Sequence, residues 1–198
     1  GEKIIYKLGM PGEHMAMNSL AALAAVKLSG ADLARAALSL AVAEAPKGRG
    51  VQHRLQIGNG TLLLIDESYN ANPVSMAAAL SLLKAAPLGK RGRRIAVLGD
   101  MLELGEHGGA LHAGLADPVS QSGADLLFAA GPLMSHLWEK VPASKRGAYS
   151  ATSQELAATL LAALQPGDAV MIKGSLGSRM GLLVEALKTR FAPVSGDN

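Results

Sequence analysis

Short polar side chains follow an apolar stretch about one third of the way along the sequence. Residues 62–65 are all Leu or Ile, and the segment after them supplies Asp66, Ser68, Asn70 and Asn72. In open α/β sheets, ligand-contacting groups lie in loops at the carboxyl ends of strands, so this segment is a candidate binding loop. A strand end closed by Asx turns, with no ligand, is the alternative interpretation.

Three other apolar stretches also end in small or polar residues. They end at Gly99-Asp100-Met101, Gly131-Pro132 and Lys173-Gly174-Ser175. Because parallel strands end at a common edge of their sheet, we expect all these ends to line one crevice. Lys173 and Ser175 precede an expected helix, whose first N–H groups favour an anionic ligand. A tight turn with Ser175 as the helix N-cap explains the same residues without a ligand.

The segment after the second of these stretches is rich in ionisable groups. It contains Asp100, Glu103, Glu106 and His107. Such groups could bind a metal ion or take part in acid–base catalysis. Carboxylates that accept bonds from nearby backbone N–H groups are the simpler interpretation.

His14 and Asn18 are four residues apart and therefore share one face of an expected helix. Alone, they indicate no more than a helix cap and a satisfied polar side chain. The sequence has no G-x-x-x-x-G-K-[ST] phosphate loop and no H-E-x-x-H, G-x-S-x-G or G-x-G-x-x-G motif. The chain by itself therefore lacks a complete site for triphosphate chemistry.

The elements expected to position these residues alternate between strands and helices. Apolar runs and turn residues predict strands at residues 52–57, 62–65, 95–98, 126–130, 148–150 and 169–172. Helices are expected at residues 75–83, 132–140, 152–164 and 180–191, with another between 106 and 122 that Pro118 breaks or restarts. Gly58-Asn59-Gly60 predicts a hairpin. The pattern predicts an α/β, Rossmann-like fold with a mostly parallel sheet and an antiparallel edge strand at 52–57.

The beginning of the sequence has a different pattern. Residues 4–8 are expected to form a strand, and two helices follow, one ending at Gly30 and one starting at Asp32 and ending before Pro46. These elements are too few to bury a core, so we expect them to be the tail of a larger domain. Residues 47–50, Lys-Gly-Arg-Gly, predict a linker or hinge before a domain at 51–198.

Composition excludes several classes of protein. The 198 residues are 49% hydrophobic, 18% charged and 3% aromatic, which is typical of a globular chain. The absence of cysteine excludes disulfides and thiolate metal sites and fits a reducing compartment. A net charge of +3 with few aromatic residues does not favour nucleic-acid binding. No apolar run approaches the roughly 20 residues of a membrane span, and the first residues, Gly1-Glu2-Lys3, do not resemble a secretory signal.

Taken together and in order, the motifs closely resemble those of the Mur ligases. The matching segments are Pro11-Gly12-Glu13-His14 with Asn18, Gly48-Arg49, Asp66-Glu67-Ser68-Tyr69-Asn70-Ala71-Asn72-Pro73, Gly99-Asp100-Met101-Leu102-Glu103-Leu104-Gly105 and Lys173-Gly174-Ser175. They cover essentially the whole chain. The resemblance implies that residues 1–46 are a helical, C-terminal remnant of the central ATP-binding domain, that 47–50 are the linker, and that 51–198 are the Mur ligase C-terminal domain.

The resemblance also implies a reaction. The segments at Asp66 and Gly99 are most similar to the family member that joins D-alanyl-D-alanine to UDP-N-acetylmuramoyl-tripeptide in peptidoglycan precursor synthesis. In that reaction ATP phosphorylates a carboxylate, and the amine attacks the acyl phosphate. Mg²⁺ and a carbamylated lysine assist, but they belong to a part of the enzyme outside this chain. No catalytic or metal-binding residue is therefore expected here, and the chain alone is expected to be inactive.

Residue roles follow from the same resemblance. The ATP-binding residues implied are His14, Asn18, Arg49 and Asp66, and the substrate-binding residues implied are Asn70, Asn72 and Lys173. Met15 departs from the family pattern, which has asparagine at this position. The resemblance further implies a cytoplasmic monomer.

Two alternatives remain open. Another Mur-type ligase or a folylpolyglutamate ligase would use the same fold with a different amine, although the Ser-Tyr-Asn-Ala-Asn string at residues 68–72 argues against it. A non-catalytic, Rossmann-like ligand- or protein-binding module would bind its partner unaided.

Overall fold

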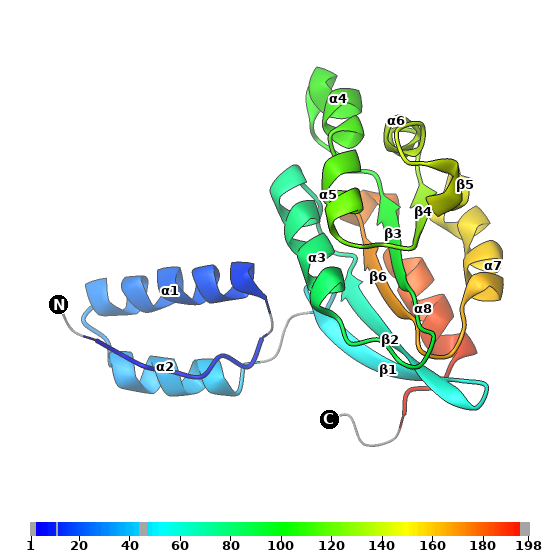
Figure 1. The fold of residues 1–198 in the computed structure, drawn as a ribbon. Coiled ribbons are helices and arrows are strands. Elements are labelled where there is room, and N and C mark those ends of the chain that lie inside the picture. Colours follow the sequence, from blue (N-terminus) through cyan, green and yellow to red (C-terminus); the bar gives the residue numbers. More distant parts are fainter. Residues whose placement is uncertain (1–2, 11, 44–46, 195–198) are drawn as a thin grey trace. The chain divides into compact units, whose positions relative to one another are not determined.

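The computed structural model describes residues 3–10, 12–43 and 47–194. The chain divides into two compact units, Gly1–Pro46 and Lys47–Asn198 (Figure 1). None of the described helices is both long enough and apolar enough to span a bilayer.

The first unit contains the two predicted helices, α1 (Glu13–Leu28) and α2 (Leu33–Ala41). Gly30, with φ of 76°, ends α1 and donates its N–H to the Lys27 carbonyl. Asp32 caps α2, since its side chain accepts the N–H of Arg35 at 3.0 Å. Both helices confirm the prediction made from apolar spacing and cap residues.

The prediction of a strand at residues 4–8 is wrong. This segment has no strand geometry, and Ile5 is fully exposed. A strand needs a partner for its backbone groups, and the described part of the first unit offers none. A side-chain bond ties the segment to α1 instead, with Tyr6 Oη 2.7 Å from Ser19 Oγ.

The second unit is built on a six-stranded sheet in the order β1-β2-β6-β3-β4-β5. The strands are β1 (Val51–Ile57), β2 (Gly60–Glu67), β3 (Arg94–Gly99), β4 (Leu126–Ala130), β5 (Arg146–Ser150) and β6 (Ala169–Lys173). β1 pairs with β2 in antiparallel register across the predicted Gly58-Asn59 turn, and the other pairs are parallel. The predicted fold class is confirmed. β6, the last strand along the chain, lies between β2 and β3.

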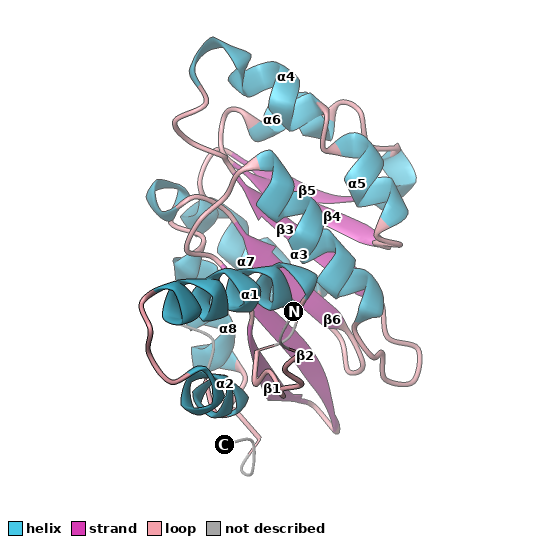
Figure 2. Ribbon diagram, turned by 90° about the vertical axis from the view of Figure 1, so that its left-hand side faces the viewer, coloured by secondary structure: helices cyan, strands magenta, loops and turns pink. Residues whose placement is uncertain are grey.

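Helices cover both faces of this sheet (Figures 1 and 2). One face packs against α3 (Pro73–Ala85), α4 (Gly108–Ala113), α5 (Ala116–Gln121) and α6 (Met134–Trp138). The other packs against α7 (Ser153–Ala163) and α8 (Gly181–Arg190). Short 3₁₀ turns complete the unit, at η1 (Gly105–His107), η2 (Ala143–Lys145) and η3 (Leu176–Ser178). The sheet is therefore buried on both sides, as its continuous apolar strands predict.

Two predictions about helices need correction. The helix expected between residues 106 and 122 is two helices, and they separate at Gly114 rather than at Pro118. Pro118 lies in the first turn of α5, where its missing N–H has no partner within the helix. Lys173 and Ser175 precede only the short 3₁₀ turn η3, where Ser175 has the N-cap position but makes no side-chain capping bond, and α8 begins later, at Gly181.

Candidate functional site

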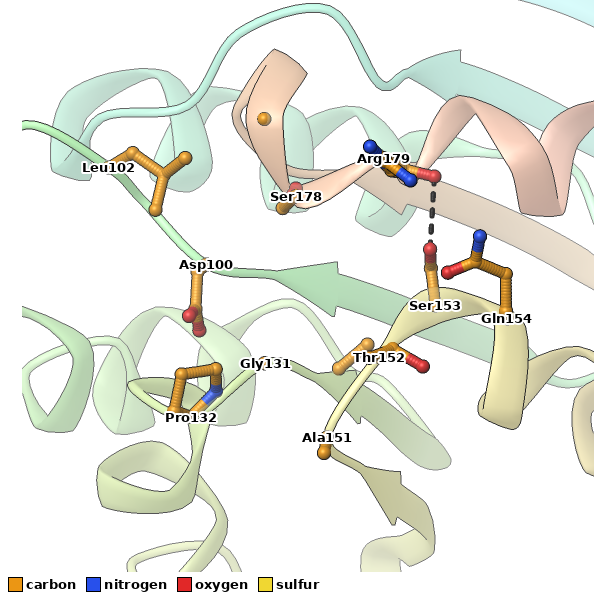
Figure 3. Close-up of a pocket in the computed structure, with 12 residues that line it drawn as sticks. Asp100, Leu102, Gly131, Pro132, Ala151, Thr152, Ser153, Gln154, Ser178 and Arg179 are labelled. Atoms are coloured by element: carbon orange, nitrogen blue, oxygen red, sulfur yellow. Dashed lines mark hydrogen bonds between the residues drawn. The ribbon is translucent and has the colours of Figure 1, made fainter.

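The carboxyl ends of the five parallel strands lie at one edge of the sheet, and two clefts open there. The first, here called the Asp100 cleft, has a volume of about 370 Å³; its lining includes Asp100, Leu102, Pro132, Thr152, Gln154 and Arg179 (Figure 3). The second, the Asp66 cleft, has about 620 Å³; its lining includes Lys47, Asp66, Tyr69, Arg179, Leu182 and Glu185. Gln154 and Arg179 line both. The single crevice expected from the sequence is thus a pair of adjoining clefts.

Asp66 shapes the loop that follows β2. Its side chain is 2% exposed, and Oδ1 accepts bonds from the Ser68 hydroxyl at 2.6 Å and the Ser68 N–H at 3.0 Å. This is the Asx turn that the sequence allows. Oδ2 bonds to no described residue, so one carboxylate oxygen of a cleft-lining residue remains available to a ligand.

Residues 47–50, predicted as a linker, are fastened to the end of β2. The Tyr69 N–H donates to the Gly48 carbonyl at 3.1 Å, and the Gly50 N–H donates to the Asp66 carbonyl at 2.8 Å. Gly48 has φ of 76°, and a Cβ there would lie only 2.9 Å from that of Tyr69. The exposed Arg49 guanidinium stacks 4.6 Å from the centre of the Tyr69 ring. This segment therefore belongs to the second unit.

The predicted substrate residue Lys173 is buried, at 2% exposure. Its Nζ donates to the Asn70 carbonyl at 2.8 Å and lies 3.5 Å from Glu67 Oε2. Burial lowers the pKa of Lys173, and the nearby Glu67 carboxylate opposes that shift. The ammonium group thus joins the end of β6 to the loop after β2.

The two predicted asparagines are also engaged by the chain itself. Asn70 Oδ1 accepts the Ala71 N–H at 2.9 Å. Asn72 Oδ1 accepts the Ser75 N–H at 2.8 Å, and Ser75 Oγ accepts the Asn72 N–H at 3.0 Å, which forms a capping box at the start of α3. These contacts explain both residues without a ligand.

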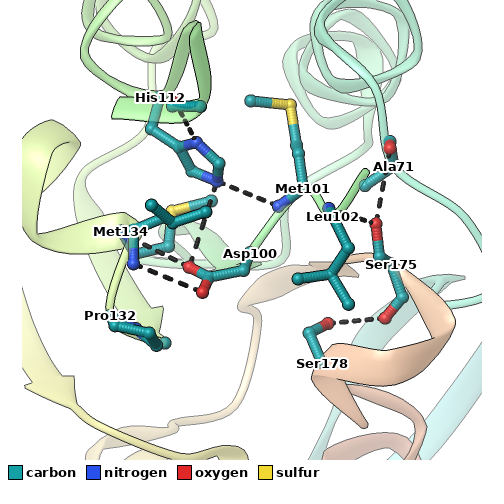
Figure 4. A network of polar contacts seen from close by, with 12 residues as sticks. Ala71, Asp100, Met101, Leu102, His112, Pro132, Met134, Ser175 and Ser178 are labelled. Carbon is teal, nitrogen blue, oxygen red and sulfur yellow. Dashed lines mark hydrogen bonds and ion pairs between the residues drawn. The ribbon is translucent and has the colours of Figure 1, made fainter. Parts of the chain in front are cut away.

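Asp100 joins the ends of β3 and β4 (Figure 4). Its carboxylate is 4% exposed and accepts the N–H groups of Met134 at 2.9 Å and Leu133 at 3.3 Å. Burial raises the pKa of Asp100, and these two N–H groups oppose the shift. Gly131 lies so close that a Cβ there would collide with the carboxylate. Asp100 therefore follows the simpler interpretation, in which it bonds to nearby backbone.

Ser175 connects three loops at the same edge. Its hydroxyl accepts the Leu102 N–H at 2.9 Å and donates to the Ala71 carbonyl at 3.4 Å, and its own N–H donates to the Asp100 carbonyl at 3.0 Å. The ends of β2, β3 and β6 are thus held together (Figure 4).

His112 is a structural residue that the sequence analysis did not single out. It is fully buried in α4; Nε2 accepts the Met101 N–H at 2.9 Å and Nδ1 donates to the Gly108 carbonyl at 2.6 Å. This arrangement fixes the tautomer with the proton on Nδ1. The sequence could have indicated this role. Leu115 and Val119 follow His112 by three and seven residues, the spacing of one apolar helix face, where a buried polar group needs a partner.

The remaining candidates divide between the two units. His14 and Asn18 lie on α1 of the first unit, where Asn18 is exposed and the His14 side chain falls outside what the structure describes. Glu106 and His107 are exposed on η1, and His107 Nε2 lies 3.8 Å from Glu106 Oε1. Among the described residues no three acidic, histidine or cysteine side chains converge in a way that could hold a metal ion.

Comparison with known proteins gives consistent results. The family model "Mur ligase, glutamate ligase domain" matches residues 53–176. The UDP-N-acetylmuramoyl-tripeptide--D-alanyl-D-alanine ligase of Synechocystis is 37% identical over 185 residues, and that of Escherichia coli is 36% identical over 183 residues. Each alignment covers 91% of this chain and 38% of the relative, so the chain spans well under half the length of these relatives.

Solved structures share the fold. MurF from Acinetobacter baumannii has a TM-score of 0.77 at 30% identity over 93% of this chain and 39% of its own. The MurF ligase of Thermotoga maritima, solved in complex with ADP, has a TM-score of 0.70 at 23% identity, over 91% of this chain and 39% of its own.

Proposed function

We propose a function from one premise, which is that this chain belongs to the Mur ligase family. We infer that it is part of an ATP-dependent ligase that joins D-alanyl-D-alanine to UDP-N-acetylmuramoyl-tripeptide. The relatives that carry this name are similar to both units of the chain. The residues outside the match, about three fifths of each relative, are expected to supply the phosphate loop, the Mg²⁺ ligands and the site for the UDP-sugar.

One observation carries the proposal: two clefts of different character open side by side on one edge of the sheet and share Gln154 and Arg179. A ligase must hold a phosphorylated acid and an amine so that they meet, because proximity supplies much of the rate. Adjoining clefts allow two ligands to be held in this way.

The surface around the clefts supports the same reading. In the described part of the second unit, the large hydrophobic side chains that are exposed all lie at or beside this edge. They are Tyr69, Val74, Leu102, Tyr149, Leu176 and Leu182. Exposed apolar side chains gathered in one place are typical of a surface that another component covers. We propose that substrates and the remainder of the enzyme cover it during the reaction.

The Asp66 cleft suits the nucleotide. The unengaged Asp66 oxygen can accept a bond from a ribose hydroxyl, and Arg49, which stacks on the cleft-lining Tyr69, supplies positive charge for phosphates. Lys47 also lines the cleft but is ion-paired with Glu185 at 2.9 Å. The adenine contacts that the family resemblance implies for His14 and Asn18 are a separate proposal.

For the dipeptide, the Asp100 cleft is a better binding site than the three residues that the family motif implies. Lys173, Asn70 and Asn72 are engaged by the chain itself, whereas this cleft combines apolar Leu102, Pro132 and Ala151 with polar groups from α7 and η3. A small peptide with methyl side chains and charged ends needs that combination.

The proposed reaction has two transfers. A carboxylate oxygen of the tripeptide bonds to the terminal phosphorus of ATP as the bond to ADP breaks. The dipeptide nitrogen then bonds to the acyl carbon, phosphate leaves with the C–O electron pair, and the nitrogen loses a proton. Mg²⁺, held by other parts of the protein, would neutralise phosphate charge. The role of this chain is to hold nucleotide and amine in register.

Kinetics of the full-length protein test the proposal. Asp66→Ala and Arg49→Ala should each lower kcat/KM for amide formation by about 100-fold, because a charge-assisted contact to the ribose or to the phosphates of the nucleotide is lost. Arg91→Ala, on an exposed loop at the other end of the sheet, serves as the matched control and should change little. Unchanged kinetics in both site variants would remove these residues from the site.

Two further measurements address the alternatives. A screen of amine acceptors with the full-length protein separates D-alanyl-D-alanine from the amino acids used by sibling ligases. Titration of the 198-residue chain with ATP and D-alanyl-D-alanine separates a detached half-site, which should bind weakly and hydrolyse no ATP, from a module that binds unaided.

A further inference from the structure

Arg179 is the only cationic residue among those that line the Asp100 cleft. Its guanidinium makes no hydrogen bond or ion pair with any residue that the structure describes. The other charged residue of the cleft, Asp100, has both carboxylate oxygens engaged by backbone N–H groups. Arg179 is exposed, so its guanidinium is available to an anionic ligand in the cleft.

The backbone of Arg179 is held in an uncommon conformation. It has φ of 55° and ψ of 31°, the left-handed region that side chains other than glycine seldom adopt. Its N–H donates to the Leu176 carbonyl at 3.1 Å, and its carbonyl accepts the buried Ser153 hydroxyl at 3.1 Å and the Leu182 N–H at 3.0 Å (Figure 3). Such strain persists where surrounding contacts enforce it, which is frequent at ligand sites.

The location of Arg179 favours one kind of ligand. Arg179 lines both clefts. The Asp66 cleft has a second cation in its lining, Lys47, which is ion-paired with Glu185 at 2.9 Å, and Arg49 stacks on its Tyr69, whereas Arg179 is the only cation that lines the Asp100 cleft. The planar guanidinium matches a carboxylate through two parallel bonds. In Figure 3, Arg179 and Gln154 lie at one side of the cleft and Asp100 with Pro132 at the other.

We propose that Arg179 binds the C-terminal carboxylate of the incoming dipeptide and thereby selects amines that carry a free carboxylate. This inference rests on the proposed function and adds a specificity-determining residue to it. Ser153 acts through Arg179 by fixing its carbonyl, so it is a positioning residue. A phosphate group is the competing anionic partner, and the experiment separates the two.

The test compares D-alanyl-D-alanine with its C-terminal amide, using full-length wild-type and Arg179→Gln proteins. Wild type should prefer the acid by about 10-fold in kcat/KM, because a charge-assisted bond to the exposed Arg179 is lost with the amide. Arg179→Gln should raise KM for the acid by about 10- to 100-fold while leaving the amide and ATP within about 2-fold. Arg179→Lys should recover part of the preference, and Ser153→Ala should weaken it less.

The control is Arg190→Gln, an exposed arginine at the end of α8 that lines neither cleft and should behave as wild type. An acid preference that survives in Arg179→Gln, or that is absent in wild type, overturns the inference while the proposed function stands. A rise in KM for ATP instead of the dipeptide assigns Arg179 to phosphate and also overturns it. Failure of wild type to join D-alanyl-D-alanine at all is a separate result, which rejects the proposed function together with this inference.

Discussion

The two edges of the sheet in the second unit use polar residues in opposite ways. At the amino edge, Asp168 is 1% exposed and accepts four bonds, three from Arg93 at 2.7 to 3.2 Å and one from the Gln165 N–H at 3.0 Å. At the carboxyl edge, Asp66 keeps an oxygen free of described partners and Arg179 has an unengaged guanidinium. The carboxyl edge thus contains unengaged polar groups beside satisfied ones such as Asp100 and Lys173, and these unengaged groups are where we propose that ligands bind.

The largest expected effect lies at the amino edge. Asp168→Ala removes the ion-pair partner of the Arg93 guanidinium, which keeps only the Ala163 carbonyl, and leaves two backbone N–H groups without their acceptor, so the free energy of unfolding should fall by about 3–5 kcal/mol. Urea unfolding of the 198-residue chain measures this. Asp125→Ala is the control, because its exposed carboxylate accepts a single bond, from the Arg94 N–H at 2.8 Å. Equal losses of unfolding free energy in both variants would contradict the idea that Asp168 is the main stabilising residue of the amino edge.

The next effect tests whether the carboxyl edge also contains stabilising residues. His112→Ala removes the acceptor of the Met101 N–H and leaves a cavity, so unfolding free energy should fall by about 2–3 kcal/mol. His112→Gln, which can still present an acceptor, should lose less. Hydrogen exchange should quicken at Met101 in the alanine variant but not at Ala169, in the centre of the sheet. A uniform change across the sheet would show that His112 supports the fold generally rather than this loop.

A smaller effect distinguishes capping from substrate binding at Asn72. Asn72→Ala should lower stability by about 1 kcal/mol through loss of the α3 cap, and Asn72→Ser should retain most of it. If capping is the whole role, Asn72→Ser leaves the KM of the full-length protein for D-alanyl-D-alanine unchanged. A raised KM in a stable Asn72→Ser protein would restore the substrate role implied by the motif.

The smallest expected effect is the contribution of Lys173 to the pH dependence of the free energy of unfolding. Burial lowers its pKa below the usual 10.5, so the unfolded chain holds more protons between the folded pKa and 10.5. Wild-type stability therefore gains a contribution as the pH rises through that window, and the contribution is absent below the folded pKa. Lys173→Met should lack this gain in urea unfolding between neutral pH and about pH 10, whereas Lys90→Met on an exposed loop should keep it. If the free energy of unfolding changes with pH in the same way for wild type and Lys173→Met, the expectation is contradicted.

Much of the fold could be predicted because its signals are local. Residues 62–65 and 95–98 are apolar throughout, as strands covered on both faces must be, and Gly58-Asn59 sets the hairpin. The position of β6 between β2 and β3 is not local information. It depends on which strands pair across long stretches of chain, from Leu63 to Ala169 on one side and from Arg94 to Ala169 on the other, and no spacing within β6 records that choice.

The candidate site was predicted less completely, for a related reason. The motif located the carboxyl edge, because topology alone brings Asp66 and Asp100 to it. It did not show which polar groups the chain itself would engage. Lys173 is bonded to Asn70 and Asn72 caps α3, while Arg179, outside every motif, is left available. Such distinctions depend on three-dimensional contacts rather than on residue type.

The central position of β6 affects how the protein can be made. Ribosomes release a chain from its amino end, so β2 and β3 emerge with their facing edges unpaired until residues 169–173 follow. The sheet can close only when this late strand enters between them, and the segment that follows it, residues 176–185, then completes the lining of both clefts. A nascent protein of this kind therefore needs protection from strand-to-strand association until almost all of the second unit has been translated.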